Sequence, residues 1–408
     1  DEAPATADVV IVGGGIVGAA TAFFAARAGL RVVVVEQRPR LATLTTPAST
    51  GAFRLQFDNP AEIALVREGV ELFTAFAERT GLAGWDLRLR QGGYLFCATT
   101  EAGLDRARVL VERQRAWGLA DVEVLDGDEA RRRWPYLGPA LLGARYRAGD
   151  GWLDPRRLAH GYAAAASEPT HIPDAAPHPP PAAFLVDTPV TRFIRDGDRV
   201  VGVETPRGVV HAPWVVVAAG PFTASVASLA GLRLDIRPTR RQKLVVPDLP
   251  DIPADAPMTI EDETSAHWRP AMRGCLALWT EHRTPPTPPA WDVPTEQAWA
   301  FGLIDPRSDH ALARIAPFWR KVWERGFDAW YIQAGQYEYT PDRRPYLGPS
   351  PVEGLAINGG YSGHGIMASG GGSRMVVDRL VGRLSADDPP AAAFAVERPL
   401  VEVDPDIL

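Results

Sequence analysis

Cysteine and lysine are scarce in this sequence. Its 408 residues include two cysteines, Cys97 and Cys275, which are far apart and lack the spacing of a metal site or a disulfide framework. Both lie in apolar, strand-like segments, so we expect two buried free thiols, which suit a reducing cytoplasm. The two lysines are Lys243 and Lys321, and arginine supplies the rest of the 43 basic residues. Any chemistry that requires a lysine therefore has two candidates.

Long apolar runs and basic clusters are also missing. No run approaches the roughly 18 apolar residues of a membrane-spanning helix, and the first residues lack the basic and apolar regions of a secretory signal. A net charge of −7 without alternating basic and aromatic residues argues against nucleic acid as a partner. The composition, 46% hydrophobic and 23% charged, is typical of a soluble protein. We expect a cytoplasmic protein with two domains, no metal and no membrane partner.

The N-terminal segment carries the strongest local pattern. Residues 8–18 predict a buried strand and a glycine turn. A helix is expected next over residues 19–28, and a second strand over residues 32–35. Gly13 permits the tight turn, Gly15 lets the backbone approach a pyrophosphate, and Gly18 lets the helix pack closely on the strand. The phosphates then meet the helix N-terminus at Ile16 and Val17. Glu36, followed by Gln37 and Arg38, stands where an acid accepts hydrogen bonds from an adenosine ribose, which disfavours NADP.

The remaining chain alternates between two kinds of pattern. Apolar spacing predicts helices over residues 60–80, 101–117, 128–134 and 151–166, whereas residues 91–97, 188–211 and 231–337 are rich in strand patterns. Residues 168–183 contain too many prolines for regular structure, so we expect an extended surface loop with His171 and His178 solvated. A buried strand at 214–217 and a strand, glycine loop and helix over 355–384 return to the nucleotide-binding pattern.

This return implies two interleaved domains in an α/β protein. We predict that residues 1–90, 150–230 and 338–408 form the nucleotide-binding domain. Residues 91–149 and 231–337 are expected to form a substrate-binding α+β domain on a mostly antiparallel sheet.

Three segments resemble one enzyme family. They are residues 13–18, the central segment 215–222 with Ala219 and Gly220, and the C-terminal pair 340–348 and 360–365. Together they resemble the FAD-dependent amine and amino-acid oxidoreductases that include D-amino acid oxidase, glycine oxidase and sarcosine oxidase, with the sarcosine oxidase branch most similar. The resemblance implies a Rossmann-type, glutathione-reductase-like FAD domain. It also implies oxidation of a C–N bond by hydride transfer to flavin N5, after which the imine hydrolyses.

The same resemblance implies which residues hold FAD. Ser49, Thr50 and Gly51 would lie on the flavin or pyrophosphate side, and Val190 would lie near the adenine through its backbone. The loop before the last helix would line the isoalloxazine, with Gly360, Gly363, His364, Gly365, Ile366 and Met367. Its backbone N–H groups and the helix N-terminus would stabilise negative charge on reduced flavin. A glycine turn without a ligand is the alternative.

Several positions depart from the family pattern. Gly335 replaces the cysteine that anchors FAD in sarcosine oxidases, so we expect FAD to be bound non-covalently. Met367 replaces the lysine that pairs with the substrate carboxylate, and Tyr337 stands where related oxidases place an arginine. The oxygen-activating lysine would fall near Leu278, and Lys243 substitutes for it only if its side chain reaches the flavin. We expect Lys243 to be a solvated strand residue instead.

Arg54 is the candidate that remains for binding a substrate carboxylate, because its planar guanidinium suits two hydrogen bonds. Balancing a flavin phosphate or an internal carboxylate is its alternative role, and Arg269 is a second candidate that is more typical of a structural arginine. Tyr337 would wall the pocket or pack in the core, and His364 would lie beside the ring or cap its loop. Met367 in place of a lysine favours a secondary or N-methylated amino acid as substrate.

Two questions stay open at this point. The electron acceptor is either O2 or a carrier, because the oxygen-activating lysine is missing. A non-catalytic FAD-binding subunit of a larger complex is the alternative of a different class, and the intact glycine loops argue against it. An NAD-dependent enzyme is disfavoured by the C-terminal glycine loop. The sequence indicates neither the substrate nor the oligomeric state.

Overall fold

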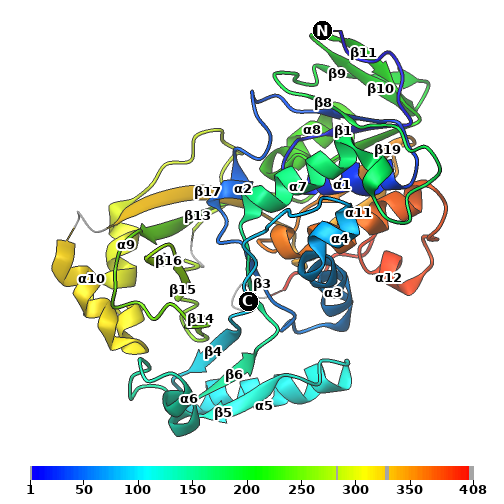
Figure 1. The fold of residues 1–408 in the computed structure, drawn as a ribbon. Helices are drawn as coiled ribbons and strands as arrows, with labels where there is room; N and C mark the ends of the chain where they lie inside the picture. The colour runs from blue at the N-terminus through cyan, green and yellow to red at the C-terminus, as the bar shows by residue number, and fades with distance from the viewer. Residues whose placement is uncertain (1, 282–283, 327–329, 404–408) are drawn as a thin grey trace.

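The computed structural model describes residues 2–281, 284–326 and 330–403, and their strands form four sheets (Figure 1). The first sheet has six strands in the order β18-β19-β12-β1-β2-β8. β18 runs antiparallel to β19, and the other neighbours are parallel. Their bounds are β1 Val9–Val12, β2 Val32–Val35, β8 Ala183–Leu185, β12 Trp214–Val217, β18 Tyr346–Pro349 and β19 Leu355–Gly359.

The valine runs of this sheet follow from burial on both faces. Val9 and Ile11 pack toward one layer, and Val10 and Val12 pack toward the other, so no position of β1 tolerates a polar side chain. Continuous apolar runs of this kind are typical of parallel strands covered on both sides. The first layer holds helices α1 (Ile16–Arg27), α3 (Pro60–Thr74), α7 (Pro155–Ser167) and α11 (Gly365–Leu380).

The opposite layer is a three-stranded antiparallel sheet together with α8 (Thr223–Leu229). Its strands are β9 (Arg192–Asp196), β10 (Arg199–Thr205) and β11 (Gly208–His211). β3 (Ala52–Phe53) and β7 (Gly151–Trp152) form a separate two-stranded antiparallel sheet.

The largest sheet has eight strands in the order β17-β13-β16-β15-β14-β4-β6-β5, all antiparallel except the β14–β4 pair. Their bounds are β4 Tyr94–Ala98, β5 Glu123–Asp126, β6 Gly143–Arg147, β13 Arg237–Val246, β14 Met258–Glu261, β15 His267–Ala271, β16 Gly274–Leu278 and β17 Tyr331–Tyr339. The α/β fold with a mostly antiparallel second sheet is therefore confirmed.

The two faces of the eight-stranded sheet differ in chemistry. Leu244, Trp268, Cys275 and Ala277 point into an apolar core with α9 (Gln297–Ile304) and α10 (Arg320–Arg325), which lie on the outer side of the sheet (Figure 1). Side chains alternate along a strand, so the residues between them face the other way. That inner face carries polar and basic side chains, and it borders the cavities described below.

The remaining elements are short or lie at the periphery. The helices are α2 Thr45–Ala48, α4 Phe76–Thr80, α5 Glu101–Ala116, α6 Gly127–Arg133 and α12 Pro389–Ala392, with 3₁₀ turns at Pro169–His171, Gly220–Phe222, Leu312–Arg314 and Pro317–Trp319. Cys97 and Cys275 are buried free thiols, as expected. Within the described ranges, no helix combines the length and the apolar composition that crossing a bilayer requires.

Some local expectations were wrong in detail. The first helix begins at Ile16, three residues earlier than expected, because Gly15 already serves as its N-cap. The helix expected over 60–80 is interrupted at Ala75, whose φ of −121° and ψ of 32° separate α3 from α4. The proline-rich loop contains a 3₁₀ turn at Pro169–His171, although His171 and His178 are exposed as expected.

Candidate active site

The glycine turn after β1 has the geometry that its three glycines require. Gly13 has a φ of +113°, and a Cβ atom there would lie 2.4 Å from the carbonyl oxygen of Ala218. A Cβ atom on Gly18 would lie 1.8 Å from the carbonyl oxygen of Gly13, so helix and turn are in direct backbone contact. Gly15 differs, because the nearest atom to its Cβ position is Thr46 Oγ1 at 3.7 Å. The middle glycine therefore opens toward a cavity.

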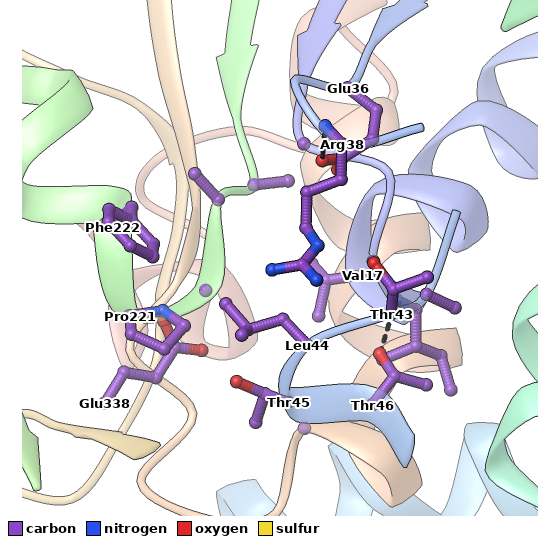
Figure 2. Close-up of a pocket in the computed structure, with 18 of the residues that line it drawn as sticks. Val17, Glu36, Arg38, Thr43, Leu44, Thr45, Thr46, Pro221, Phe222 and Glu338 are labelled. Atoms are coloured by element: carbon purple, nitrogen blue, oxygen red, sulfur yellow. Dashed lines mark hydrogen bonds between the residues drawn. The ribbon is translucent and has the colours of Figure 1, made fainter. Parts of the chain in front are cut away.

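We call this the glycine-turn cavity. Figure 2 shows it between α1, the segment after β2 and the 3₁₀ turn at Gly220–Phe222. Its lining includes these residues singled out from the sequence: Gly13, Gly15, Ile16, Val17, Glu36, Gln37, Arg38, Ser49, Val190, Ala219, Gly220, Tyr337, Gly363, Gly365 and Ile366. The three segments that carry the family resemblance thus meet at one cavity.

The cavity suits an elongated anionic dinucleotide. A Cβ atom on Gly220 would meet no atom within 4 Å, and Nε of Arg38 is buried without a hydrogen-bond partner. The carboxylate of Glu36 is oriented by the N–H groups of Gly14 and Arg38 at 2.7 and 2.8 Å. The open space at the turn leaves room for phosphates, and the unpartnered guanidinium nitrogen is a hydrogen-bond donor to them. The fixed carboxylate of Glu36 is an acceptor for the hydroxyl groups of a ribose.

Other residues of this cavity were not singled out from the sequence. They are Thr43, Leu44, Thr45, Thr46, Pro221, Phe222, Trp291, Gln336 and Glu338. Phe222 stacks on Trp291 with ring centroids 3.9 Å apart. Trp291 belongs to the proline-rich residues 285–294, so this contact places that segment at the cavity wall. No local motif marks these residues, because their place depends on the packing of distant segments.

Glu338 is the most unusual of them. Its side chain is 9% exposed, its Oε1 accepts a hydrogen bond from the N–H of Tyr361 at 3.4 Å, and its Oε2 has no partner. Burial raises the pKa of this carboxyl to about 7, against the lowering effect of the N–H groups of Gly360 and Tyr361. A protonated Glu338 presents a hydrogen-bond donor to the cavity, whereas an ionised one presents a buried charge.

Seven predicted cofactor residues do not line the glycine-turn cavity. Three of them, Thr50, His364 and Met367, line the second cavity described below, and the other four are glycines. Gly18 and Gly360 contact other parts of the protein instead, and a Cβ atom on Gly51 would lie 2.1 Å from the carbonyl oxygen of Leu153. Gly335 lines a small cavity with Lys243, Ser49 and Tyr337. These glycines allow backbone segments to pack closely beside the cavity, but they do not line it themselves.

A second cavity of about 930 Å³ contains most residues predicted to be catalytic. We call it the Arg54 cavity, and its lining includes Ser49, Thr50, Arg54, Tyr337, Gly363, His364, Ile366 and Met367. Ser49, Tyr337, Gly363 and Ile366 line the glycine-turn cavity as well, so the two cavities meet at these residues. A group bound in one cavity therefore lies close to a molecule bound in the other.

The guanidinium group of Arg54 has room for an anion. Its Nη1 donates to the carbonyl oxygen of Gln56 at 2.8 Å, and its Cζ lies 4.3 Å from the ring centroid of Phe57. It forms no ion pair with any residue that the structure describes. An arginine held by a carbonyl and a ring but by no carboxylate retains donors for a bidentate partner.

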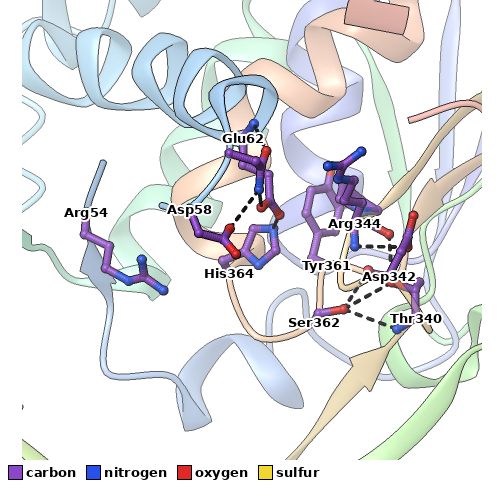
Figure 3. A network of polar contacts seen from close by, with 12 residues as sticks. Arg54, Asp58, Glu62, Thr340, Asp342, Arg344, Tyr361, Ser362 and His364 are labelled. Atoms are coloured by element: carbon purple, nitrogen blue, oxygen red, sulfur yellow. Dashed lines mark hydrogen bonds and ion pairs between the residues drawn. The ribbon is translucent and has the colours of Figure 1, made fainter. Parts of the chain in front are cut away.

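His364 is paired with a buried acid that the sequence analysis missed. Its Nε2 lies 3.1 Å from Oε1 of Glu62, and both side chains are almost fully buried (Figure 3). Asn59 caps α3 by accepting a hydrogen bond from the N–H of Glu62 at 2.9 Å, which fixes the start of this helix. Burial alone would raise the pKa of Glu62, but the contacts with His364 and Asn59 outweigh it and lower the pKa.

The second arginine candidate has a different position. Arg269 is 7% exposed, and its Nε donates to the carbonyl oxygen of Thr50 at 2.9 Å. It lines a third cavity and is absent from the lining of the Arg54 cavity. His267 does line the Arg54 cavity, and burial lowers the pKa of its imidazole to about 4, so that this ring is neutral near pH 7.

Lys243 is buried, so the expectation of a solvated strand lysine is wrong. Its side chain is 5% exposed, and its Nζ donates to the carbonyl oxygens of Pro47 and Ser49 at 3.2 and 3.1 Å. It lies directly opposite Leu278 in the β13–β16 pair. No group of three or more potential metal ligands occurs among the residues that the structure describes.

Comparisons with known proteins agree with this geometry. A family model described as FAD dependent oxidoreductase matches residues 8–379. The chain is 26% identical over 402 residues to mitochondrial dimethylglycine dehydrogenase of Mus musculus, which covers 92% of this chain and 42% of that protein. It is 27% identical over 446 residues to D-amino acid dehydrogenase of Cereibacter sphaeroides, which covers 96% of this chain and 95% of that protein.

The same fold occurs among solved structures. The crystal structure of L-proline dehydrogenase from P. horikoshii superposes with a TM-score of 0.81 at 22% identity, covering 96% of this chain and 97% of that one. The chain therefore spans less than half the length of the mitochondrial relative and nearly the full length of the bacterial one.

Proposed function

The chain belongs to the FAD dependent oxidoreductase family, and from this premise we propose that it oxidises the C–N bond of an amino acid. The favoured substrate is a secondary or N-methylated amino acid. The observation that carries the proposal is the guanidinium group of Arg54, which lacks a carboxylate partner among the described residues and faces a cavity that meets the glycine-turn cavity. The three proteins compared above are a dimethylglycine, a D-amino acid and an L-proline dehydrogenase, which supports the same substrate class.

FAD is the proposed cofactor, and the glycine-turn cavity is its proposed site. Gly15 and the N-terminus of α1 would hold the pyrophosphate, and Glu36 would bind the ribose. FAD supplies the two-electron acceptor for the oxidation when it is bound. Gly335 offers no thiol for covalent attachment, so acid precipitation of the purified protein should release all of the yellow colour into the supernatant.

The chain's own residues would bind and orient the substrate. Arg54 would bind its carboxylate in two parallel hydrogen bonds, and Tyr337 would hold the amine end at the junction of the two cavities. Met367 supplies an apolar wall in place of a cation, which suits an alkylated amine better than an ammonium group. The Glu62–His364 pair would position the loop that begins α11.

Two electron acceptors are consistent with this proposal, namely O2 and a carrier. The three relatives named above are dehydrogenases, which supports a carrier. Lys243 lies opposite Leu278, the position at which the resemblance places an oxygen-activating lysine, and this supports O2. We further propose that residues 1–90, 150–230 and 338–408 form the FAD-binding domain, and that residues 91–149 and 231–337 form the substrate-binding domain. The first set contributes the strands of the six-stranded sheet, and the second contributes almost all of the eight-stranded sheet.

The test is an anaerobic titration of the yellow protein with sarcosine, N,N-dimethylglycine, proline, pipecolate, glycine and several D-amino acids. Bleaching of the visible spectrum by one of them supports the proposal and names the substrate class. Rapid return of colour in air identifies an oxidase, and slow return identifies a dehydrogenase. A flavin that none of these compounds bleaches contradicts the proposed reaction and favours a non-catalytic FAD-binding subunit.

A further inference from the structure

A third cavity of about 760 Å³ lies beside the segment that contains Ser49. We call it the Lys243 cavity. Its lining comes from the segments around residues 47–49 and 88–90, from β7 and the start of α7, and from strands β13, β15, β16 and β17 with adjoining loops. Of its residues, only Ser49 also lines the Arg54 cavity. The FAD and substrate sites proposed above do not include it, although Lys243 on its wall is the residue considered above for O2. A cavity of this volume is large enough for a small organic ligand.

The charge of this cavity is strongly one-sided. Its lining contains six cationic side chains, those of Arg88, Arg90, Arg156, Lys243, Arg269 and Arg273, and the single carboxylate of Asp154. That carboxylate already accepts hydrogen bonds from the N–H groups of Arg156 and Arg157 as the cap of α7. Arg273 pairs with Asp248 at 3.3 Å, whereas the other five cations form no ion pair with a described residue.

Two of these cations are buried at the inner end of the cavity. Lys243 and Arg269 are 5% and 7% exposed, and their polar atoms bond only to main-chain carbonyl oxygens among the described residues. Burial and the positive charges of Arg269 and Arg156 lower the pKa of Lys243 to about 8. Two buried cations without a counter-ion are costly, and an anion placed between them removes much of that cost.

The remaining wall of the cavity is apolar. The indole of Trp152 lies 5.4 Å from the Cζ atom of Arg269, and Ile252 and Leu276 complete this surface. Met272 and Tyr331 are 65% and 49% exposed at its rim, which is unusual for large apolar side chains. An apolar wall with charges at its inner end suits a ligand that has an apolar body and an anionic head.

We propose that the Lys243 cavity is a second ligand site, which binds an organic anion through a carboxylate or phosphate group and packs its apolar body on the wall. The buried cations hold the anionic group, and the exposed arginines at the rim attract the ligand from solution. The site is separate from the Arg54 cavity, so ligand and substrate bind at the same time. This proposal does not depend on which amine the protein oxidises.

The test uses the FAD-loaded full chain and two aromatic anions, phenyl phosphate and benzoate, measured by isothermal titration calorimetry. Benzyl alcohol is the neutral control with the same ring. We expect at least one anion to bind and benzyl alcohol to bind at least tenfold more weakly. Because Arg54 is itself proposed to bind a carboxylate, only binding that Lys243→Gln weakens is assigned to this cavity. Within that binding, a higher affinity for phenyl phosphate identifies a phosphate ligand, and a higher affinity for benzoate identifies a carboxylate ligand.

Four variants locate the site. Lys243→Gln should weaken binding at least tenfold, and Arg156→Gln about threefold, because Arg156 lies at the rim and its side chain forms no hydrogen bond or ion pair with a described residue. Arg54→Gln and the exposed control Arg320→Gln should leave the affinity within twofold.

Urea unfolding midpoints of the variants establish that each one is folded. The proposal is overturned if neither anion binds the wild type, or if both bind Lys243→Gln and Arg156→Gln as tightly as the wild type. Loss of binding in Arg54→Gln alone would place the anion in the substrate cavity and overturn it as well. Because binding is measured directly, a failure of amine oxidation has no bearing on these results.

Discussion

The replacement Glu338→Gln changes the charge of the glycine-turn cavity with almost no change in shape. In the folded protein, Glu338 holds its proton up to about pH 7, whereas its ordinary pKa is 4.5. The folded state therefore binds more protons between these two values, and the stability of the wild type falls as pH rises through this window. The variant carries no such group, so its stability lacks this contribution.

The difference between the two pKa values sets the size of the effect. One pKa unit corresponds to about 1.4 kcal/mol, so the shift of Glu338 corresponds to about 3 kcal/mol as an upper bound. We expect Glu338→Gln and wild type to have nearly equal stability well below pH 4.5, where the carboxyl is protonated in both states. Above about pH 8 the variant should be more stable, by at most about 3 kcal/mol.

The assay is urea unfolding of the flavin-free protein at four pH values between about 4.5 and about 8. The exposed Glu71→Gln is the matched control for the substitution itself, because Glu71 lies on the outer side of α3, away from the cavity. A difference between Glu338→Gln and wild type that is the same at every pH would refute the reasoning. It would mean that water or a rotated side chain solvates Oε2 of Glu338.

Three further predictions concern the two site cavities. Gly15→Ala should leave the unfolding midpoint unchanged, because its Cβ position is open, but should weaken FAD binding at least tenfold in a fluorescence titration. Gly18→Ala should instead destabilise the protein by about 3 kcal/mol, because its Cβ atom would meet a carbonyl oxygen 1.8 Å away. Arg54→Gln should raise KM for the amino acid about 100-fold with a smaller change in kcat, and steady-state kinetics with the matched decarboxylated amine should show no difference between variant and wild type. Glu62→Gln should lower the unfolding free energy by about 2 kcal/mol at neutral pH, because it removes the charge beside His364. The pKa of Glu62 is lowered in the folded state, so this difference between variant and wild type should shrink as pH falls below 4.5, which urea unfolding at several pH values would measure.

The residues that could be predicted from the sequence are those whose roles depend on neighbouring backbone. The turn requires the φ of +113° at Gly13, and Gly18 lies directly against the carbonyl oxygen of Gly13, so both requirements arise within ten residues and the spacing alone reveals the turn. The pairing of Glu62 with His364 has no such local basis, because it joins the N-terminus of α3 to a loop about 300 residues later.

Glu62 did carry a signal that was overlooked. Asn59 and Pro60 mark a helix start, and an acid three residues after an Asn cap is a recognised partner of that cap. Glu338 carried none. It lies between Tyr337 and Tyr339 on β17, and alternation along the strand places it on the opposite side from its neighbours. Gln336, Tyr337 and Glu338 nevertheless all line the glycine-turn cavity, so alternation alone does not say which of them reaches it. The place of Glu338 depends on its packing against Tyr361, and this is a tertiary property.

Lys243 shows why a comparison made strand by strand fails for charged sites. At the family's lysine position this chain has Leu278, and a comparison along β16 alone concludes that the cation is lost. In an antiparallel pair, however, directly opposite residues lie on the same face about 5 Å apart, so a cation can move to the neighbouring strand and keep its place in space. Lys243 is opposite Leu278 in this register, and the carbonyl oxygens of Pro47 and Ser49, from a segment almost 200 residues earlier, cover its ammonium group. Lys243 would therefore supply a positive charge beside the position at which the resemblance places the family's lysine, and both the O2 question and the proposed anion site depend on this residue.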